Sequence, residues 1–302
     1  MFSLTMDFLL YYLVRALIAF LQTLPLKWVV RIGRVGGVLF YIFDARHRNV
    51  ARKNLSLCFS AEKTRAEIRA LALENFKRIG ENFACAIKTS CMKENEIENI
   101  LERTGLEKLR LSATAGKKES RIFAIGHFGN FELLARCFMF VPGYKFATTY
   151  RGLRQPSLNR LLRSLREKSG CLFFERRAEA DALKAALNRG SLFLGLFADQ
   201  NTGDKGLRLP FFSHLAATGA APAIFALRYQ CPLFISICYR TGLGKWRVEV
   251  EDEIPTREND QARSTAEIML DVNRVFEKAV RRDPANWFWV HNRWKIRSEN
   301  GG

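Results

Sequence analysis

AEADALKAALNRGSLFLGLFA, residues 178–198, is the stretch of the sequence that decides the fold. Its first part, 178–189, is rich in alanine and leucine and is followed by Gly190, a residue type that commonly terminates helices. The second part, 191–198, is a continuous apolar run, which is typical of a strand that is buried on both faces. A helix that leads through one glycine into such a strand predicts an α/β fold.

Further strand candidates lie on both sides of this stretch. They are short apolar runs or, in the last case, an alternation of apolar and polar residues, and they cover 121–126, 144–149, 171–174, 233–239 and 245–251. Helical stretches separate most of them. We therefore predict a mixed, largely parallel sheet that is flanked by helices.

Two helix starts carry a capping-box signature, in which a hydroxyl and a carboxylate three residues apart satisfy free backbone donors. They are Thr64 with Glu67 and Ser264 with Glu267. Beyond the second start, apolar residues recur at helical spacing and predict one buried face: Ile268, Val272, Val275, Phe276 and Ala279.

The composition indicates a folded protein with anionic partners. The chain has 302 residues, 48% of them hydrophobic, which is enough for a buried core. Its formal net charge of +18 favours nucleic acid, anionic lipid or acidic proteins as partners.

The seven cysteines show no C-x-x-C pair and no zinc-ligand spacing, and their odd number argues against a complete disulfide framework. We expect a reducing environment for the main body, with most cysteines packed as small hydrophobic residues.

The N-terminus has a different character from the rest of the chain. The run 8–24 is about as long as the shortest membrane-crossing helices, and Arg15 is its only charged residue, so a short or tilted anchor is expected. A cleaved signal peptide fits poorly, because Asp7 stands where a basic region is required.

The following segment, 28–43, mixes apolar residues with Arg31 and Arg34 and is expected to lie at the membrane interface. The alternative is a pair of buried helices in a soluble protein. We predict an anchor with its interfacial helix over 1–45 and a catalytic domain over 46–302.

The most informative motif is RIFAIGHFGNFELLAR, residues 121–136. In a continuous helix His127 and Glu132 would point to different faces, so His127 must precede the helix if the two are to meet. Gly126 and Gly129 permit the necessary turn, and Asn130 is a favoured N-cap residue. We expect a loop histidine that packs against a first-turn glutamate.

Such a pair suits general base catalysis. A neutral imidazole can take a proton from a hydroxyl, while a carboxylate on its other nitrogen fixes the tautomer. The sequence contains no G-x-S-x-G nucleophile elbow, which favours direct attack by a substrate hydroxyl. The alternative is an ordinary loop histidine close to a helix cap.

The block GHFGNFELLAR resembles the H-x-x-x-x-D/E block of the lysophospholipid acyltransferase superfamily, in particular its late lipid A acyltransferase branch. Three further blocks are similar to that branch in order and spacing. They are TTYRGLRQPSLNRLLRSLREKSG (148–170), FADQNTGDKGLRLPFFSHLAATGAAPAIFALRYQCP (197–232) and WFWVHNRWK (287–295). The resemblance spans nearly the whole chain, including its N-terminal membrane segment.

The resemblance implies a glycerophosphate-acyltransferase-like fold and transfer of a fatty acyl chain from acyl carrier protein. The implied acceptor is a hydroxyl of a lipid A precursor, a Kdo-modified, phosphorylated glucosamine disaccharide, at the cytoplasmic face of the bacterial inner membrane. It implies neither metal nor organic cofactor, inner membrane lipids as further partners, and no nucleic acid. His127 would be the general base and Glu132 its orienting residue.

The substrate-binding candidates are polar residues of these blocks: Asn130, Arg151, Arg154, Asp199, Gln200 and Asn201. The two arginines suit phosphate or oxyanion contacts, unless they are solvated surface side chains. Asp199 should lie at the carboxyl end of its strand, as His127 does at the end of another, where such sheets collect their chemistry. Residues 199–201 either order the site and contact substrate or form a structural turn.

One departure from the family pattern and two rival functions remain. FFSH (211–214) stands where the family usually has a glycine after the phenylalanines, so His214 is interpreted as structural, and His291 as positional. An acyltransferase for another acceptor, such as lysophosphatidate, ornithine lipid or a phosphatidylinositol mannoside, would share the same chemistry. The net charge alone also fits a non-catalytic, membrane-tethered binding protein.

Overall fold

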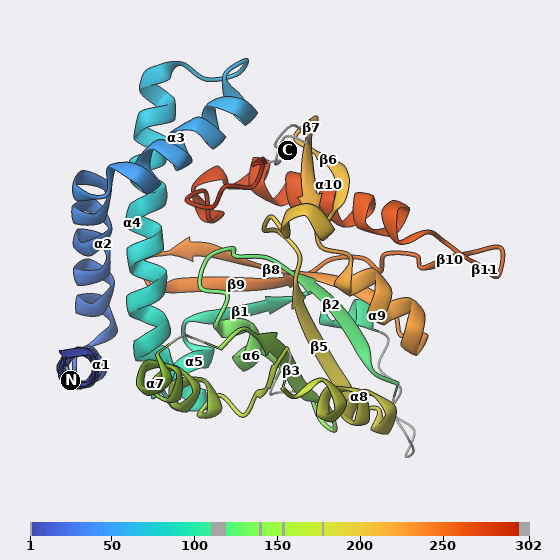
Figure 1. The fold of residues 1–302 in the computed structure, drawn as a ribbon, viewed down its shortest axis with the longest axis horizontal. Coiled ribbons are helices and arrows are strands. Elements are labelled where there is room, and N and C mark those ends of the chain that lie inside the picture. Colours follow the sequence, from blue (N-terminus) through green and yellow to red (C-terminus); the bar gives the residue numbers. More distant parts are fainter. Residues whose placement is uncertain (1, 110–118, 139–140, 153–154, 177, 296–302) are drawn as a thin grey trace.

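The computed structural model describes residues 2–109, 119–138, 141–152, 155–176 and 178–295 (Figure 1). Within these ranges the main sheet has the order β1-β9-β8-β2-β5-β3-β4. Its strands are β1 (Leu101–Thr104), β2 (Arg121–Ile125), β3 (Lys145–Tyr150), β4 (Leu172–Glu175), β5 (Leu192–Phe197), β8 (Leu233–Gly242) and β9 (Lys245–Val250). β8 and β9 pair antiparallel, and the other neighbours pair parallel. The predicted mixed, largely parallel sheet is confirmed.

Each predicted strand segment overlaps one of these strands, with ends that agree within three residues. β1 was not predicted. It is four residues long and carries Glu102 and Arg103, and its burial pattern lacks the continuous apolar run that marks the central strands.

Alternate residues of the central strands face two separate cores. Leu192, Leu194 and Leu196 of β5 pack in one cluster with α8 (Ala180–Arg189), α9 (Ala221–Tyr229) and α10 (Thr265–Arg282). Phe193 packs in the other cluster with α6 (Leu133–Phe138). This two-sided burial is what the apolar run at 191–198 predicts.

The remaining helices are α1 (Phe2–Thr23), α2 (Leu26–Phe43), α3 (Ala45–Phe59), α4 (Arg65–Thr89), α5 (Glu94–Glu98) and α7 (Pro156–Glu167), with short 3₁₀ turns η1 (Leu106–Leu109), η2 (Gly203–Lys205) and η3 (Pro284–Asn286). Two small hairpins, β6 (Leu207–Phe211) with β7 (His214–Thr218) and β10 (Arg257–Glu258) with β11 (Gln261–Ala262), lie outside the main sheet.

Both predicted capping boxes are present. Thr64 and Ser264 each accept a hydrogen bond from the backbone of the glutamate three residues later, and each glutamate side chain accepts one from the cap residue. On α10 the predicted face is buried at Ile268, Val272, Phe276 and Ala279, and Val275 is half-buried.

α2 lies along α4 so closely that their backbones touch (Figure 1). A Cβ atom at Gly37 would lie 2.1 Å from the carbonyl oxygen of Phe76, and one at Gly80 would lie 2.0 Å from that of Gly33. Any side chain at these positions would push the helices apart.

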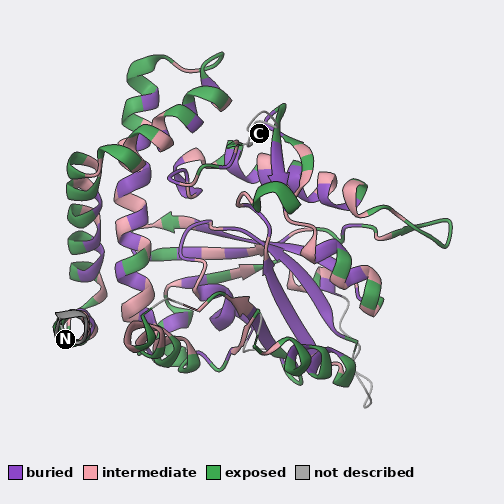
Figure 2. Cartoon of the chain, in the orientation of Figure 1, coloured by how far each residue is buried: buried purple, intermediate pink, exposed green. Residues whose placement is uncertain are grey.

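The outer sides of α1 and α2 are apolar and exposed (Figure 2). Phe8, Leu13, Val35 and Phe43 are all more than half exposed. The alternative interpretation, in which α1 and α2 are two fully buried helices, therefore does not describe them. In the ranges that the structure describes, no helix combines the length and the apolar composition that a membrane crossing needs, so the predicted anchor is not confirmed. The division at residue 45 stays a prediction.

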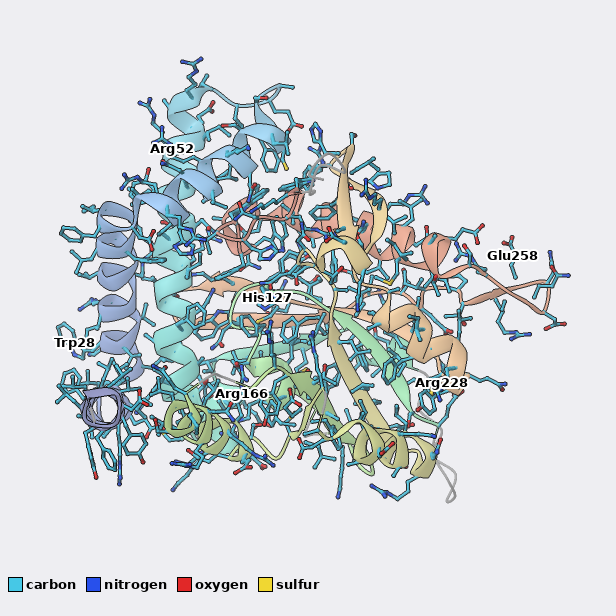
Figure 3. All side chains as sticks on the ribbon, viewed as in Figure 1. Trp28, Arg52, His127, Arg166, Arg228 and Glu258 are labelled. Carbon is cyan, nitrogen blue, oxygen red and sulfur yellow. The ribbon has the colours of Figure 1, made fainter. Side chains whose placement is uncertain are left out.

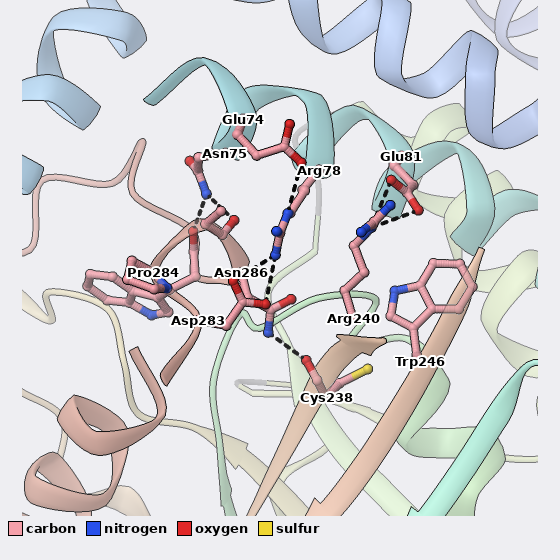
Figure 4. Close-up of polar contacts among 12 residues, drawn as sticks. Glu74, Asn75, Arg78, Glu81, Cys238, Arg240, Trp246, Asp283, Pro284 and Asn286 are labelled. Carbon is pink, nitrogen blue, oxygen red and sulfur yellow. Dashed lines mark hydrogen bonds and ion pairs between the residues drawn. The ribbon is translucent and has the colours of Figure 1, made fainter. Parts of the chain in front are cut away.

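A buried charge network joins α2, α4 and β8, and Figure 4 shows its contact between Glu81 of α4 and Arg240 of β8. Glu81 is fully buried and accepts hydrogen bonds from Arg34 at 3.1 Å, Arg240 at 3.1 Å and the backbone of Gly244 at 3.0 Å. A carboxylate without these donors would be strongly destabilising there, so the network fixes how the helices meet the sheet.

The cysteines are free thiols, and the expected packing holds for most of them. Five are buried, Cys58 is half-buried, and Cys91 is exposed. Burial raises the pKa of Cys231 to about 11 and that of Cys137 to about 12, so these thiols stay protonated.

Candidate active site

His127 and Asp199 meet at the carboxyl edge of the sheet. β2 and β5 are parallel neighbours with Ile125 opposite Phe197, and each of the two polar residues follows its strand by two positions. The Nδ1 atom of His127 lies 2.9 Å from Oδ1 of Asp199, and the His127 backbone N–H donates to Oδ2 at 2.8 Å. The sheet itself therefore sets the geometry of this pair.

Asp199 is a buried, ionised acceptor. Its second oxygen also accepts a hydrogen bond from the indole N–H of Trp287 at 2.9 Å, and the residue is only 1% exposed. Burial alone would raise the pKa of Asp199, but the charge of His127 and the hydrogen bonds from His127 and Trp287 outweigh it and hold the pKa below its ordinary value.

An ionised carboxylate can only accept, so the imidazole of His127 in its neutral form donates from Nδ1 and keeps a lone pair on Nε2. Aromatic rings fix the orientation of the imidazole. Phe197 stacks on it with a centroid distance of 4.3 Å, and Phe131 and Phe288 lie at 4.9 and 5.8 Å. The imidazole side chain is 19% exposed. Such an arrangement suits a general base.

The expected hydrogen bond between His127 and Glu132 is replaced by the one to Asp199. Glu132 instead forms an ion pair with Arg166 of α7, whose Nη2 lies 2.6 Å from Oε1. The reason is local geometry. α6 begins only at Leu133, so Glu132 lies in the turn before it, where its carboxylate reaches α7.

The turn that carries His127 depends on Gly129, which has φ of +51°. A Cβ atom there would lie 2.5 Å from the carbonyl oxygen of Cys238. The next residue, Asn130, is 1% exposed, and neither polar atom of its amide has a hydrogen-bond partner within the described residues. Asn130 lines the same pocket as His127 and Glu132, so a buried, unpaired amide faces the site.

An apolar groove adjoins this pocket. We call it the α1–α7 groove; it has a volume of about 420 Å³ and shares Phe83, Ala86, Phe131 and Glu132 with the His127 pocket. Its other apolar lining comes from α1, α4 and α7: Val14, Leu17, Ile18, Ile87, Leu158, Leu161, Leu162 and Leu165. The leucines that alternate with arginines in the sequence of α7 thus face a cavity.

A second cavity opens from the other side of the pocket. This cavity, termed the His47 cavity, has a volume of about 540 Å³ and shares Ile79, Phe83 and Phe288 with the His127 pocket. Gln200, His47 and His291 supply polar groups to its wall. Phe83 borders all three spaces, so it stands where they meet.

The other substrate-binding candidates are more scattered. The side-chain amide of Asn201 donates to the carbonyl oxygens of Asn292, Arg293 and Lys295 and so holds the C-terminal segment in place. Arg151 is exposed just after β3. Arg154 lies outside the described residues.

The two other histidines of the sequence blocks, His214 and His291, lie in different surroundings. His214 is exposed at the start of β7, beside a two-residue turn in which Phe212 and Ser213 both have positive φ, at 52° and 61°. Burial lowers the pKa of His291; the Asp199 charge opposes this, and His127 and Arg293 add to it.

Several residues that build the site were not predicted. The side-chain amide of Asn54 donates to the carbonyls of Trp289 and His291, and that of Asn75 donates to those of Ala285 and Trp287. These contacts clamp the C-terminal segment against α3 and α4 and so place the Trp287 indole on Asp199. The tryptophan-rich block at 287–295 was the only sequence signal for them.

Arg293 is fully buried and donates to the Ala217 carbonyl and the Thr218 hydroxyl, both at 2.8 Å. Burial lowers its pKa to about 10, although the charge of Asp199 acts in the opposite direction. Within the described residues, no three His, Cys, Asp or Glu side chains gather closely enough to hold a metal ion.

Comparison with known sequences gives the family. Residues 1–296 match the profile of a family described as bacterial lipid A biosynthesis acyltransferase. The chain belongs to this family. The resemblance drawn from the four sequence blocks is confirmed, and the protein is an acyltransferase.

Two Escherichia coli members of the family are similar over most of their length. The lipid A biosynthesis palmitoleoyltransferase is 24% identical over 284 residues, which cover 91% of this chain and 87% of the relative. The lipid A biosynthesis lauroyltransferase is 27% identical over 281 residues, which cover 91% and 88%. A lipid A biosynthesis acyltransferase of Shigella flexneri is 24% identical over 284 residues.

Proposed function

We propose that the protein transfers a fatty acyl chain from acyl carrier protein to a hydroxyl of a Kdo-modified, phosphorylated glucosamine lipid A precursor. The reaction takes place at the cytoplasmic face of the bacterial inner membrane. The observation that carries the proposal is an imidazole whose Nδ1 is held by Asp199, whose Nε2 has no partner in the part of the chain that the structure describes, and which lies beside an apolar groove.

His127 acts as the general base. Its Nε2 takes the proton of the acceptor hydroxyl as the hydroxyl oxygen attacks the thioester carbonyl, so that a C–O bond forms. The C–S bond then breaks, and the imidazolium returns the proton to the departing thiolate. Asp199 stabilises the transient imidazolium and keeps the tautomer, and it does not exchange a proton itself.

Asn130 is the candidate for oxyanion stabilisation. Its buried amide lines the His127 pocket without a partner in the described structure, so its N–H group is available to the negative oxygen of the tetrahedral intermediate. One such donor is worth about 10²-fold to 10³-fold in rate.

The α1–α7 groove is assigned to the acyl chain of the donor. Its volume of about 420 Å³ lies within the usual range for small-molecule sites, and its lining is mostly apolar. The names of the two Escherichia coli relatives, a palmitoleoyltransferase and a lauroyltransferase, support a fatty acyl donor. Glu132 lines both the His127 pocket and the α1–α7 groove. We assign its ion pair with Arg166 the role of holding α7, and with it the groove, beside His127.

The His47 cavity is assigned to the acceptor, because Gln200 and His291 offer polar contacts that a sugar requires. Arg151 and Arg154 remain proposed contacts for phosphate groups. The net charge of +18 favours encounter with an acidic carrier protein and a phosphorylated lipid.

The test is acyl transfer in vitro from radiolabelled acyl carrier protein to a purified lipid A precursor. His127→Ala should reduce kcat by at least about 10²-fold, whereas His214→Ala, which changes an exposed histidine of β7, should not. Wild-type rates for His127→Ala would refute the proposal.

Mass spectrometry of lipid A from cells with and without the gene tests the acceptor separately. We expect one acyl chain fewer in its absence. Unchanged lipid A together with active transfer to lysophosphatidate, ornithine lipid or a phosphatidylinositol mannoside would keep the chemistry and replace the acceptor.

A further inference from the structure

A basic groove lies between α3 and the first turns of α4, apart from the site described above. This α3–α4 groove has a volume of about 400 Å³ and is lined by Asn49, Arg52, Lys53, Ser56, Arg65, Ile68 and Arg69. Four of these seven residues are cations.

Within the described residues, no carboxylate lies at ion-pair distance from Arg52, Lys53, Arg65 or Arg69. The neighbouring carboxylates are occupied elsewhere. Glu62 pairs with Arg281 at 2.8 Å, and Glu67 closes the capping box of Thr64. Like charges held together repel one another, so this groove gains stability from an anion.

The placement of the cations follows from helix geometry. Residues 49, 52, 53 and 56 recur at three- and four-residue spacing on one face of α3, and residues 65, 68 and 69 face them from the start of α4. That start is also the positive end of a 25-residue helix dipole. Anionic groups are therefore favoured there by both side chains and backbone.

The groove is on the outer face of α3. The inner face holds buried Ala51 and Leu55, and Asn54, whose amide contacts the segment next to the His127 pocket. α3 thus separates the groove from the reaction centre. A phosphate of an acceptor that reacts at His127 is a poor occupant for it.

The apolar sides of α1 and α2 lead toward this groove. Phe43, the last residue of α2, is 79% exposed, and α3 begins two residues later. Figure 3 shows Trp28 of α2 and Arg52 on one side of the molecule and Arg228 and Glu258 on the other. Most large apolar side chains that are exposed in the described structure belong to α1 and α2. Such an exposed apolar surface indicates that this side of the molecule contacts a membrane or another partner.

We propose that the α3–α4 groove binds the phosphate groups of anionic phospholipids while the outer sides of α1 and α2 enter the membrane interface. An apolar helical surface next to a cluster of cations is the combination that attaches proteins to anionic bilayers. This inference concerns attachment and orientation, and it does not depend on the acyl-transfer chemistry.

The test is sedimentation of the full-length protein with vesicles of phosphatidylcholine alone or with about 30% phosphatidylglycerol. The groove variant carries Arg52→Gln, Lys53→Gln, Arg65→Gln and Arg69→Gln. Its control carries Lys145→Gln, Lys184→Gln, Arg189→Gln and Arg228→Gln, which removes the same charge from exposed positions away from the groove.

Wild type and control should prefer the anionic vesicles, and the groove variant should lose at least about tenfold of that preference while it still binds phosphatidylcholine. Equal preference in the groove variant and its control would overturn the proposal. Unchanged vesicle binding with a raised KM for acyl carrier protein would also overturn it and assign the groove to an acidic protein.

Vesicle binding of the wild-type protein at high salt tests the same proposal without a variant, so it is informative even if the groove variant does not fold. In about 1 M salt the Debye length falls to about 3 Å, so the preference for anionic vesicles should largely disappear while apolar binding persists. A preference that survives such salt contradicts a phosphate site.

Discussion

Replacing Asp199 by asparagine tests the central arrangement most directly, because it changes one charge and one acceptor. In the wild type, one oxygen of Asp199 accepts from Nδ1 of His127 and the other from the His127 backbone and Trp287. The amide oxygen of asparagine can keep the second pair of hydrogen bonds. Its NH₂ group then faces Nδ1, which must accept, so the proton of neutral His127 moves to Nε2.

A protonated Nε2 cannot take the hydroxyl proton. The expected loss in kcat is between about 10² and 10⁴, the range that a general base contributes, or about 3 to 5 kcal/mol in activation free energy. The folded state should change little, because the substitution removes a buried charge while the amide can keep these hydrogen bonds.

The assay pairs transfer kinetics with ¹⁵N NMR of the His127 ring. Asp199→Asn should lower kcat and shift the neutral tautomer from Nδ1–H to Nε2–H. Glu132→Gln is the matched control, because Glu132 contacts Arg166 and has no described contact with the imidazole. A tautomer shift in Glu132→Gln and none in Asp199→Asn would refute the assignment of the orienting carboxylate.

Four further outcomes are expected. Glu81→Gln should lower the free energy of unfolding by about 3 kcal/mol, since it leaves two half-buried arginines poorly compensated, whereas Glu62→Gln at an exposed pair should cost less than about 1 kcal/mol in urea titrations. Ser213→Gly should stabilise by up to about 1 kcal/mol, because Ser213 has φ of 61° in the hairpin turn; an unchanged or lower Tm would contradict this. The pKa of His291 is lowered by burial, so the unfolded chain binds its proton more readily and stability falls as pH drops below about 6.5. The free energy of unfolding of His291→Gln should therefore fall less steeply than that of wild type between about pH 7 and 5. Parallel curves of stability against pH for the two proteins would contradict this role of His291. Leu162→Trp in the α1–α7 groove should shift transfer toward shorter acyl chains, while Leu215→Trp on the exposed part of β7 should leave chain selection as it is.

Local patterns in the sequence determined most of the elements. Strands, capping boxes and the apolar face of α10 each depend on residues a few positions apart, and burial and hydrogen bonding act on that spacing directly. The same locality explains why β1 was missed, since four residues with charged side chains carry too little apolar periodicity.

The tertiary structure alone decided the partner of His127. Glu132 is five residues away in sequence, yet the turn directs it to Arg166, whereas Asp199 comes from 72 residues away because β2 and β5 lie side by side. Which strands become neighbours depends on how the whole chain buries its apolar surface, and no short segment records that choice. The sequence thus placed His127 and Asp199 at strand ends, and the order of the strands brought them within hydrogen-bond distance.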